Sequence, residues 1–202
     1  YAGKKDEMLK LAKEMPRTHF SYENFMMYRW KGDADFEEFQ GYLSFLIYHT
    51  AEMIELAVGQ RHDNGEFIYP LEDRIGLWKT EVDFLELIFP DGDYQIKAQL
   101  GEVACSFLCT AYLRKQNYEE AWKWLEKGAG FAIHMDTYDF DSVHTSPILR
   151  GYSSGGWIME AEGNRSQSML EWLTNDDEAA VLHCDARYET LVSRLKEVAK
   201  KP

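Results

Sequence analysis

Residues 102–136 read EVACSFLCTAYLRKQNYEEAWKWLEKGAGFAIHMD, and this stretch decides the fold. Apolar residues recur at helical spacing on both sides of a short polar break at residues 114–118. Small residues stand where two helix axes would approach each other, at Cys109, Ala121 and Gly128, with larger residues beside them. Two antiparallel helices pack closely only when small and large side chains alternate in this way. The stretch therefore predicts a helical hairpin.

The spacing within this hairpin resembles that of one tetratricopeptide unit. The positions that carry the pattern are Leu108, Cys109, Tyr112, Ala121, Leu125 and Gly128. Such units bury their apolar faces by stacking on one another, because one unit alone leaves a face uncovered. We therefore expect an all-α, tetratricopeptide-like (TPR-like) α-α superhelix, in which antiparallel hairpins form an array.

Helical periodicity also dominates the rest of the chain, and no alternating pattern predicts a strand. The predicted helices cover residues 5–14, 21–32, 35–58, 70–89, 93–114, 118–134, 167–173 and 185–199. Polar or glycine-rich connections separate them at 59–69 and 137–165. The helix at 70–89 carries two apolar stripes, so we expect it inside the stack. No shift in composition marks a boundary, which predicts one helical domain over residues 1–202.

The overall charge limits the kinds of partner. The chain holds 35 acidic and 22 basic residues, for a net charge of −13. Nucleic-acid affinity rests mainly on Lys and Arg at phosphates, so we expect no direct DNA contact. No apolar run approaches a membrane span and no signal peptide is present, which predicts a cytoplasmic protein. Cys105 and Cys109 fall one turn apart and read as small core residues in a reducing compartment, with metal or redox work as the alternative.

Candidate catalytic and metal-binding patterns are weak. The most metal-like group is Asp136, Asp139, Asp141 and His144, but it lacks the glycine and the distal glutamate of a calcium loop. We expect these carboxylates to cap helices instead. No phosphate-binding glycine loop and no nucleophile motif is recognisable. The sequence thus predicts no enzyme, no cofactor and no resident metal.

A concave inner surface is the expected binding site, because helical arrays bind ligands on the surface made by the first helix of each pair. The groove candidates are Tyr48, His49, Glu52, Ser106, Thr110 and Leu113. His49 and Glu52 lie one turn apart, which fits either a paired core histidine or a ligand contact. The expected occupant is a peptide or protein ligand.

Several segments in one order resemble a known family. They are LEDRIGLW (71–78), IFPDGDY (88–94), YEEAWKWLEK (118–127), AIHMD (132–136), TSPIL (145–149), MLEWL (169–173) and DARYETL (185–191). Together they are similar to the C-terminal TPR-like domain of Firmicutes XRE-type, lambda-repressor-like helix-turn-helix regulators. The resemblance covers residues 70–200 well and residues 5–60 loosely.

The resemblance implies the C-terminal part of a longer protein whose N-terminal helix-turn-helix DNA-binding domain is absent here. It implies a regulatory domain of a transcriptional regulator that senses a ligand or peptide, forms a homodimer, and meets DNA only through that missing domain. The alternative is a TPR-type protein-protein interaction scaffold or adaptor with no DNA-binding role.

Overall fold

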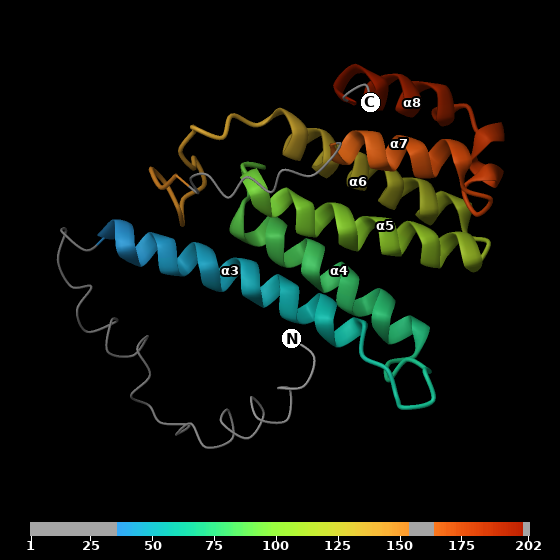
Figure 1. The fold of residues 1–202 in the computed structure, drawn as a ribbon, viewed down its shortest axis with the longest axis horizontal. Helices are drawn as coiled ribbons and strands as arrows, with labels where there is room; N and C mark the ends of the chain where they lie inside the picture. The colour runs from blue at the N-terminus through green and yellow to red at the C-terminus, as the bar shows by residue number, and fades with distance from the viewer. Residues whose placement is uncertain (1–35, 154–163, 200–202) are drawn as a thin grey trace, which may run out of the picture. The chain divides into compact units, whose positions relative to one another are not determined.

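The computed structural model describes residues 36–153 and 164–199, and the regular secondary structure of these residues is helical (Figure 1). The α-helices are α3 (Phe36–Val58), α4 (Leu71–Ile88), α5 (Ala98–Arg114), α6 (Tyr118–Thr137), α7 (Arg165–Asn175) and α8 (Arg187–Val198). Two 3₁₀ turns, η2 (Gln95–Lys97) and η3 (Ala180–Cys184), precede α5 and α8. The described part holds no strand beyond one isolated bridge between Arg61 and Phe67, so the all-α prediction is confirmed.

The chain divides into two compact units, Tyr1–Phe39 and Gln40–Pro202. Apart from residues 36–39, the first unit lies outside the described residues, and so do the helices predicted at 5–14 and 21–32. The helices from α4 to α8 and most of α3 belong to the second unit. None of the described helices is both long and apolar enough to cross a membrane.

The predicted hairpin is the pair α5–α6. Asn117 begins α6, and its side chain accepts a hydrogen bond from the Glu120 amide at 3.3 Å, which satisfies one free amide of the first turn. Gln116 takes a left-handed conformation, with φ of 55°, and reverses the chain. These local features let two long helices lie antiparallel after a very short connection.

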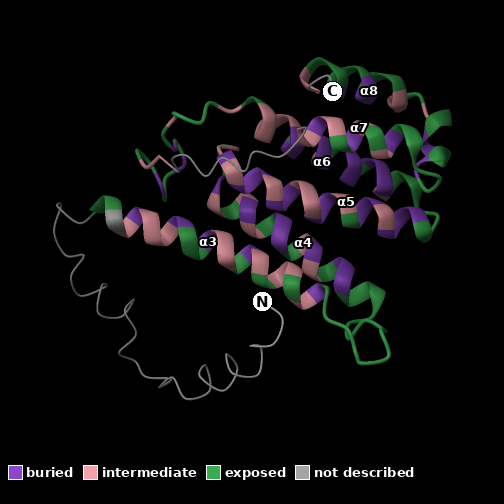
Figure 2. Cartoon of the chain, viewed as in Figure 1, coloured by how far each residue is buried: buried purple, intermediate pink, exposed green. Residues whose placement is uncertain are grey.

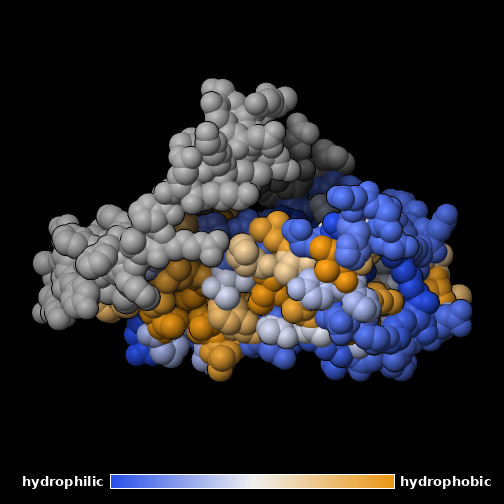
Figure 3. Space-filling model, turned by 90° about the horizontal axis from the view of Figure 1, so that it is seen from below, coloured by the Kyte–Doolittle hydropathy of each residue, from blue (hydrophilic) through white to orange (hydrophobic). Residues whose placement is uncertain are grey.

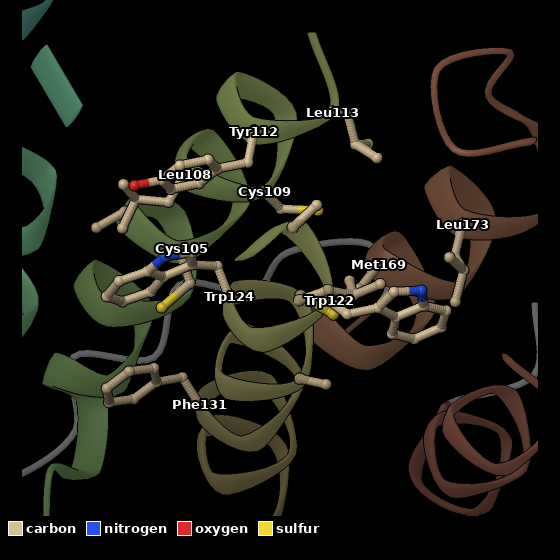
Figure 4. Close-up of a cluster of buried hydrophobic side chains, with 14 of the residues drawn as sticks. Cys105, Leu108, Cys109, Tyr112, Leu113, Trp122, Trp124, Phe131, Met169 and Leu173 are labelled. Atoms are coloured by element: carbon tan, nitrogen blue, oxygen red, sulfur yellow. The ribbon is translucent and has the colours of Figure 1, made fainter. Parts of the chain in front are cut away.

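Small residues bring α5 and α6 together as expected. Cys109, Ala121 and Gly128 are all buried, and a Cβ added at Gly128 would lie 3.1 Å from the Cβ of Cys105. A Cβ at Gly101 would lie 2.6 Å from the Phe131 ring, closer than real contacts allow. Figure 4 shows α5 and α6 side chains meeting residues of α7 in this core.

The start of α5 differs from the prediction. The sequence places the helix start at Asp93, but the α-helix begins at Ala98 after a 3₁₀ turn. The reason is that the Asp93 carboxylate accepts a hydrogen bond from the Thr145 amide at 2.6 Å instead of capping its own helix. A contact across the fold therefore replaces the local one.

Helices α4, α5, α6, α7 and α8 pack on one another in sequence order, and α6 also packs against α8. One of the two predicted stripes of α4, made of Ile75, Trp78, Val82 and Leu85, is buried. The other stripe, made of Leu77, Phe84 and Ile88, is only partly buried. Figure 2 shows burial concentrated in α4, α5 and α6. A second cluster joins Ile47 and Ala51 of α3 to Leu85, Phe89, Leu100 and Leu149.

Candidate ligand cleft

A cleft of about 180 Å³ opens between α5 and α7, with α6 forming part of its wall. Its lining residues are Glu102, Ser106, Phe107, Cys109, Thr110, Trp124, Leu125, Gly128, Ser168, Met169 and Trp172. Apolar and aromatic groups predominate, and hydroxyl groups and one carboxylate interrupt them. A cavity of about 150 Å³ admits a benzene ring, so this cleft has room for roughly one side chain rather than a large cofactor.

The polar end of the cleft is held by Glu102. One oxygen of this carboxylate accepts a hydrogen bond from Ser106 Oγ at 3.1 Å, and the other lies 3.4 Å from an Arg165 guanidinium nitrogen. Burial raises the pKa of Glu102, and the Arg165 charge and the Ser106 hydrogen bond oppose that rise. The group is thus a partly desolvated ion pair, with a hydroxyl beside it.

The far wall depends on how α7 begins. The Asp136 carboxylate accepts hydrogen bonds from the Arg165 amide at 3.0 Å and the Ser166 amide at 2.7 Å. The Asn164 side chain accepts another from the Gln167 amide at 3.0 Å. A carboxylate at a helix N-terminus is favoured by the helix dipole and by the free amides there. These contacts fix α7, and with it Met169 and Trp172, against the end of α6.

The α3 helix shares the electrostatics of this region. Burial raises the pKa of Tyr48, Glu52 and Glu55 add to the rise, and the Arg165 charge opposes it. The guanidinium of Arg165 therefore acts on groups of both α3 and α5.

The six predicted groove residues fall in different places. Ser106 and Thr110 line the cleft. Leu113 is buried in the main core, and Tyr48 packs against the second cluster. His49 and Glu52 are partly exposed and joined by a 2.7 Å contact between Nδ1 and Oε2. Arg165, Met169 and Trp172 were not predicted, since nothing in the long 137–165 connection shows which helix would face α5.

The predicted metal-like group is dispersed. Asp136 caps α7, and Asp139 accepts a hydrogen bond from the Asp141 amide at 3.0 Å within its own turn. His144 lies elsewhere, beside Asp93. Among the residues that the structure describes, no group of three or more potential ligand side chains could hold a metal ion.

A second polar cluster lies at the start of α5, and the sequence pattern did not predict that its residues come together. His144 Nδ1 is 3.2 Å from Asp93 Oδ2, and its ring stacks on Phe89 with centroids 5.6 Å apart. Lys97 is only 1% exposed, and burial lowers its pKa to about 8, which the Asp93 charge partly opposes. Burial and the Lys97 charge lower the pKa of His144, against the effect of Asp93.

This cluster fastens the loop after α6 to the turn before α5. Asp91 accepts hydrogen bonds from the hydroxyls of Thr145 and Ser146, and the Gln95 amide donates to His134 Nε2 at 3.0 Å. Gln95 also adopts a left-handed φ of 48°. Shifted pKa values and an unusual backbone often mark functional sites. Because Lys97 and His144 are both about 1% exposed, the cluster as it stands holds the fold and does not face a ligand.

No family model matches the chain, and neither a curated protein nor a solved structure matches it. The resemblance to XRE-type regulators thus stays a prediction.

Proposed function

We propose that this chain is a ligand-sensing regulatory domain, and that the cleft between α5 and α7 receives one side chain of a peptide. The observation that carries the proposal is the cleft itself, which separates the first helices of two successive helix pairs and has Leu125 and Gly128 of α6 in its wall. A ligand placed there touches three helices at once. Its binding free energy therefore depends on their spacing.

The lining supports an apolar or aromatic side chain with polar backbone around it. Met169, Trp172 and Phe107 offer apolar contact, and Ser106, Thr110 and Ser168 offer hydroxyl groups. Pockets that bind ligands are mostly apolar, with a few polar groups that fix orientation. A non-enzymatic role fits these groups better than catalysis. Glu102 is already paired with Arg165, and burial raises the pKa of the Cys109 thiol to about 12.

The regulatory role is proposed because the cleft lies between helices whose spacing a ligand could change. A ligand can shift an equilibrium between two helix spacings only by its different affinity for them. Wedging α7 away from α5 would strain the Glu102–Arg165 pair. A homodimer and an attached DNA-binding domain belong to the same proposal and rest on the resemblance. A TPR-like curvature also belongs to it and rests on the hairpin spacing, and a cytoplasmic location rests on the sequence, in which no membrane span or signal peptide is recognisable. The scaffold role is the alternative, and the coding sequence upstream of Tyr1 separates the two.

The cleft can be tested with N-acetyl-phenylalaninamide as the probe. We expect the Met169 methyl signal, observed by NMR in methyl-labelled protein, to shift and saturate at millimolar probe. Thr110→Trp fills the cleft and should abolish the shift. Thr190→Trp places the same side chain on the exposed surface of α8 and should leave it unchanged. N-acetyl-glycinamide, which lacks the ring, should give no shift.

Equal titrations in the parent and Thr110→Trp would refute a ligand site in this cleft. Circular dichroism of both Trp variants separates loss of binding from loss of folding. A variant that keeps its helical signal and its melting temperature but loses the probe supports the site.

A further inference from the structure

The outer surface of α3 carries a line of exposed apolar side chains, here called the outer stripe. Its members are Phe45 (55% exposed), Leu46 (40%), Met53 (63%) and Leu56 (53%). They lie on the side of α3 opposite Ile47, Ala51 and Val58, which are buried. Figure 3, seen from the side of the molecule on which α3 lies, shows apolar surface gathered there beside strongly polar surface.

An apolar line of this length is unusual on a free surface. Single exposed apolar residues are normal, but contiguous ones mark places where another molecule binds. The stripe runs from Phe45 to Leu56, which is about 16 Å of helix or roughly three turns. Its spacings of seven, eight and eleven residues are those that a second helix packed along α3 would contact.

The acidic and basic side chains of α3 itself have one sign of charge. The α3 helix contains four glutamates and no lysine or arginine. Glu52 already pairs with His49, which itself packs on the Phe45 ring with centroids 4.0 Å apart. Burial raises the pKa of Glu55, and the nearby Glu52 charge adds to the rise. A cation brought close to Glu52 and Glu55 would relieve this repulsion.

We propose that the outer stripe docks a basic amphipathic helix of a partner protein. The partner's apolar face covers Leu46 and Met53, and its lysines or arginines lie opposite Glu52 and Glu55. Helix-on-helix docking of this kind uses apolar anchors at helical spacing, and charge complementarity selects the partner. The stripe faces away from the core that the cleft adjoins, so this partner is distinct from the ligand of the proposed function.

The test measures fluorescence anisotropy of a labelled model helix built of leucine and lysine at amphipathic spacing, titrated with the full chain. We expect Leu46→Ser combined with Met53→Ser to weaken binding at least tenfold. The matched control is Val143→Ser with Val181→Ser, which removes two similarly exposed apolar residues on other elements and should change nothing. Glu52→Gln with Glu55→Gln should weaken binding several-fold and flatten its salt dependence.

Three results would overturn the proposal. Equal affinity of the stripe variant and its control would mean that net charge alone attracts the peptide. A leucine–glutamate peptide that binds as tightly would remove the charge argument. Sedimentation that shows a dimer of the parent chain, dissolved by the stripe variant, would assign the stripe to a second copy. Circular dichroism confirms that each variant keeps its helices.

Discussion

Glu81 of α4 gives the sharpest test of the packing. Its side chain is fully buried at 0% exposure, and neither carboxylate oxygen has a hydrogen-bond partner in the structure. Burial, with a smaller contribution from Glu55, raises its pKa from 4.5 to about 8. In the folded chain at neutral pH, the group is therefore mostly a neutral acid, whereas in the unfolded chain it is an anion.

The consequence for stability follows from this difference. Between pH 4.5 and 8 the folded state binds a proton that the unfolded state has lost, so the free energy of unfolding falls as pH rises. Each pH unit in this window removes about 1.4 kcal/mol, or about 3 kcal/mol between pH 4.5 and pH 7. Below pH 4.5, Glu81 is protonated in both the folded and the unfolded chain, so it no longer lowers the free energy of unfolding.

Glu81→Gln removes the titration and keeps the shape. We expect its free energy of unfolding, relative to the parent, to increase by about 3 kcal/mol when the pH is raised from about 4.5 to about 7. Glu81→Met also removes the unpartnered polar atoms, and should stabilise further at every pH. Urea unfolding at a series of pH values, followed by circular dichroism and tryptophan fluorescence, measures both effects.

Glu126→Gln, on the exposed face of α6, is the control and should stay within about 0.5 kcal/mol of the parent throughout. If Glu81→Gln and the parent lose stability in parallel as pH rises, Glu81 is not held in a desolvated site. The packing of α4 described above would then be wrong.

Three other substitutions probe separate parts of the fold by thermal or urea unfolding. Gly101→Ala would place a Cβ 2.6 Å from the Phe131 ring and should cost about 2–4 kcal/mol, whereas Gly130→Ala, with no atom within 4 Å of its Cβ, should stabilise by about 0.5–1 kcal/mol. Equal effects of the two would refute the α5–α6 register. Lys97→Met should stabilise the fold by about 1–3 kcal/mol near pH 7. Because the pKa of Lys97 is lowered from 10.5 to about 8 in the folded chain, the free energy of unfolding of the parent should rise with pH between these two values. A parent whose stability does not change over this pH range would contradict the burial of Lys97. Asp136→Ala removes the acceptor for two α7 amides and should cost about 1–2 kcal/mol, with protection of those amides from hydrogen exchange as the direct readout; unchanged protection would contradict the cap.

The hairpin could be predicted because its determinants are local. A close approach of two helices is indicated by small residues within 20 residues of sequence, at Cys109, Ala121 and Gly128. The side chain of Asn117 caps the start of the second helix. Helical periodicity of this strength fixes both the element type and the buried face. Ser106 and Thr110, which were predicted as groove residues on the first helix of the hairpin, are among the residues that line the cleft.

The other wall of the cleft could not be predicted, because it depends on contacts across the chain. Arg165 and Glu102, which form an ion pair, are 63 residues apart in the sequence. Ser166, whose amide donates to Asp136, is 30 residues from it. The polar cluster at the start of α5 is less visible still. His144 and Asp93 lie 51 residues apart in the sequence, and local spacing instead grouped His144 with Asp136, Asp139 and Asp141 and placed Asp93 at the start of a helix. Asp93 was predicted as a local cap for this reason, although its long-range partner Thr145 binds it instead.

The two buried ionisable groups bear on how a ligand could act. Glu81 lies in α4 and Lys97 directly before α5, and the burial of each ionisable group costs stability in this part of the fold. Regions of low local stability are those that open or shift first, since less free energy separates their alternative arrangements. Ligand contacts that differ by only 1–3 kcal/mol between two spacings are then roughly enough to redistribute the population. If Glu81→Met and Lys97→Met stabilise the fold as expected, they should also reduce the shift in the spacing of α3–α5 that a ligand bound beside α7 causes. The reason is that the same ligand binding energy would then have to overcome a larger free-energy difference between the two spacings.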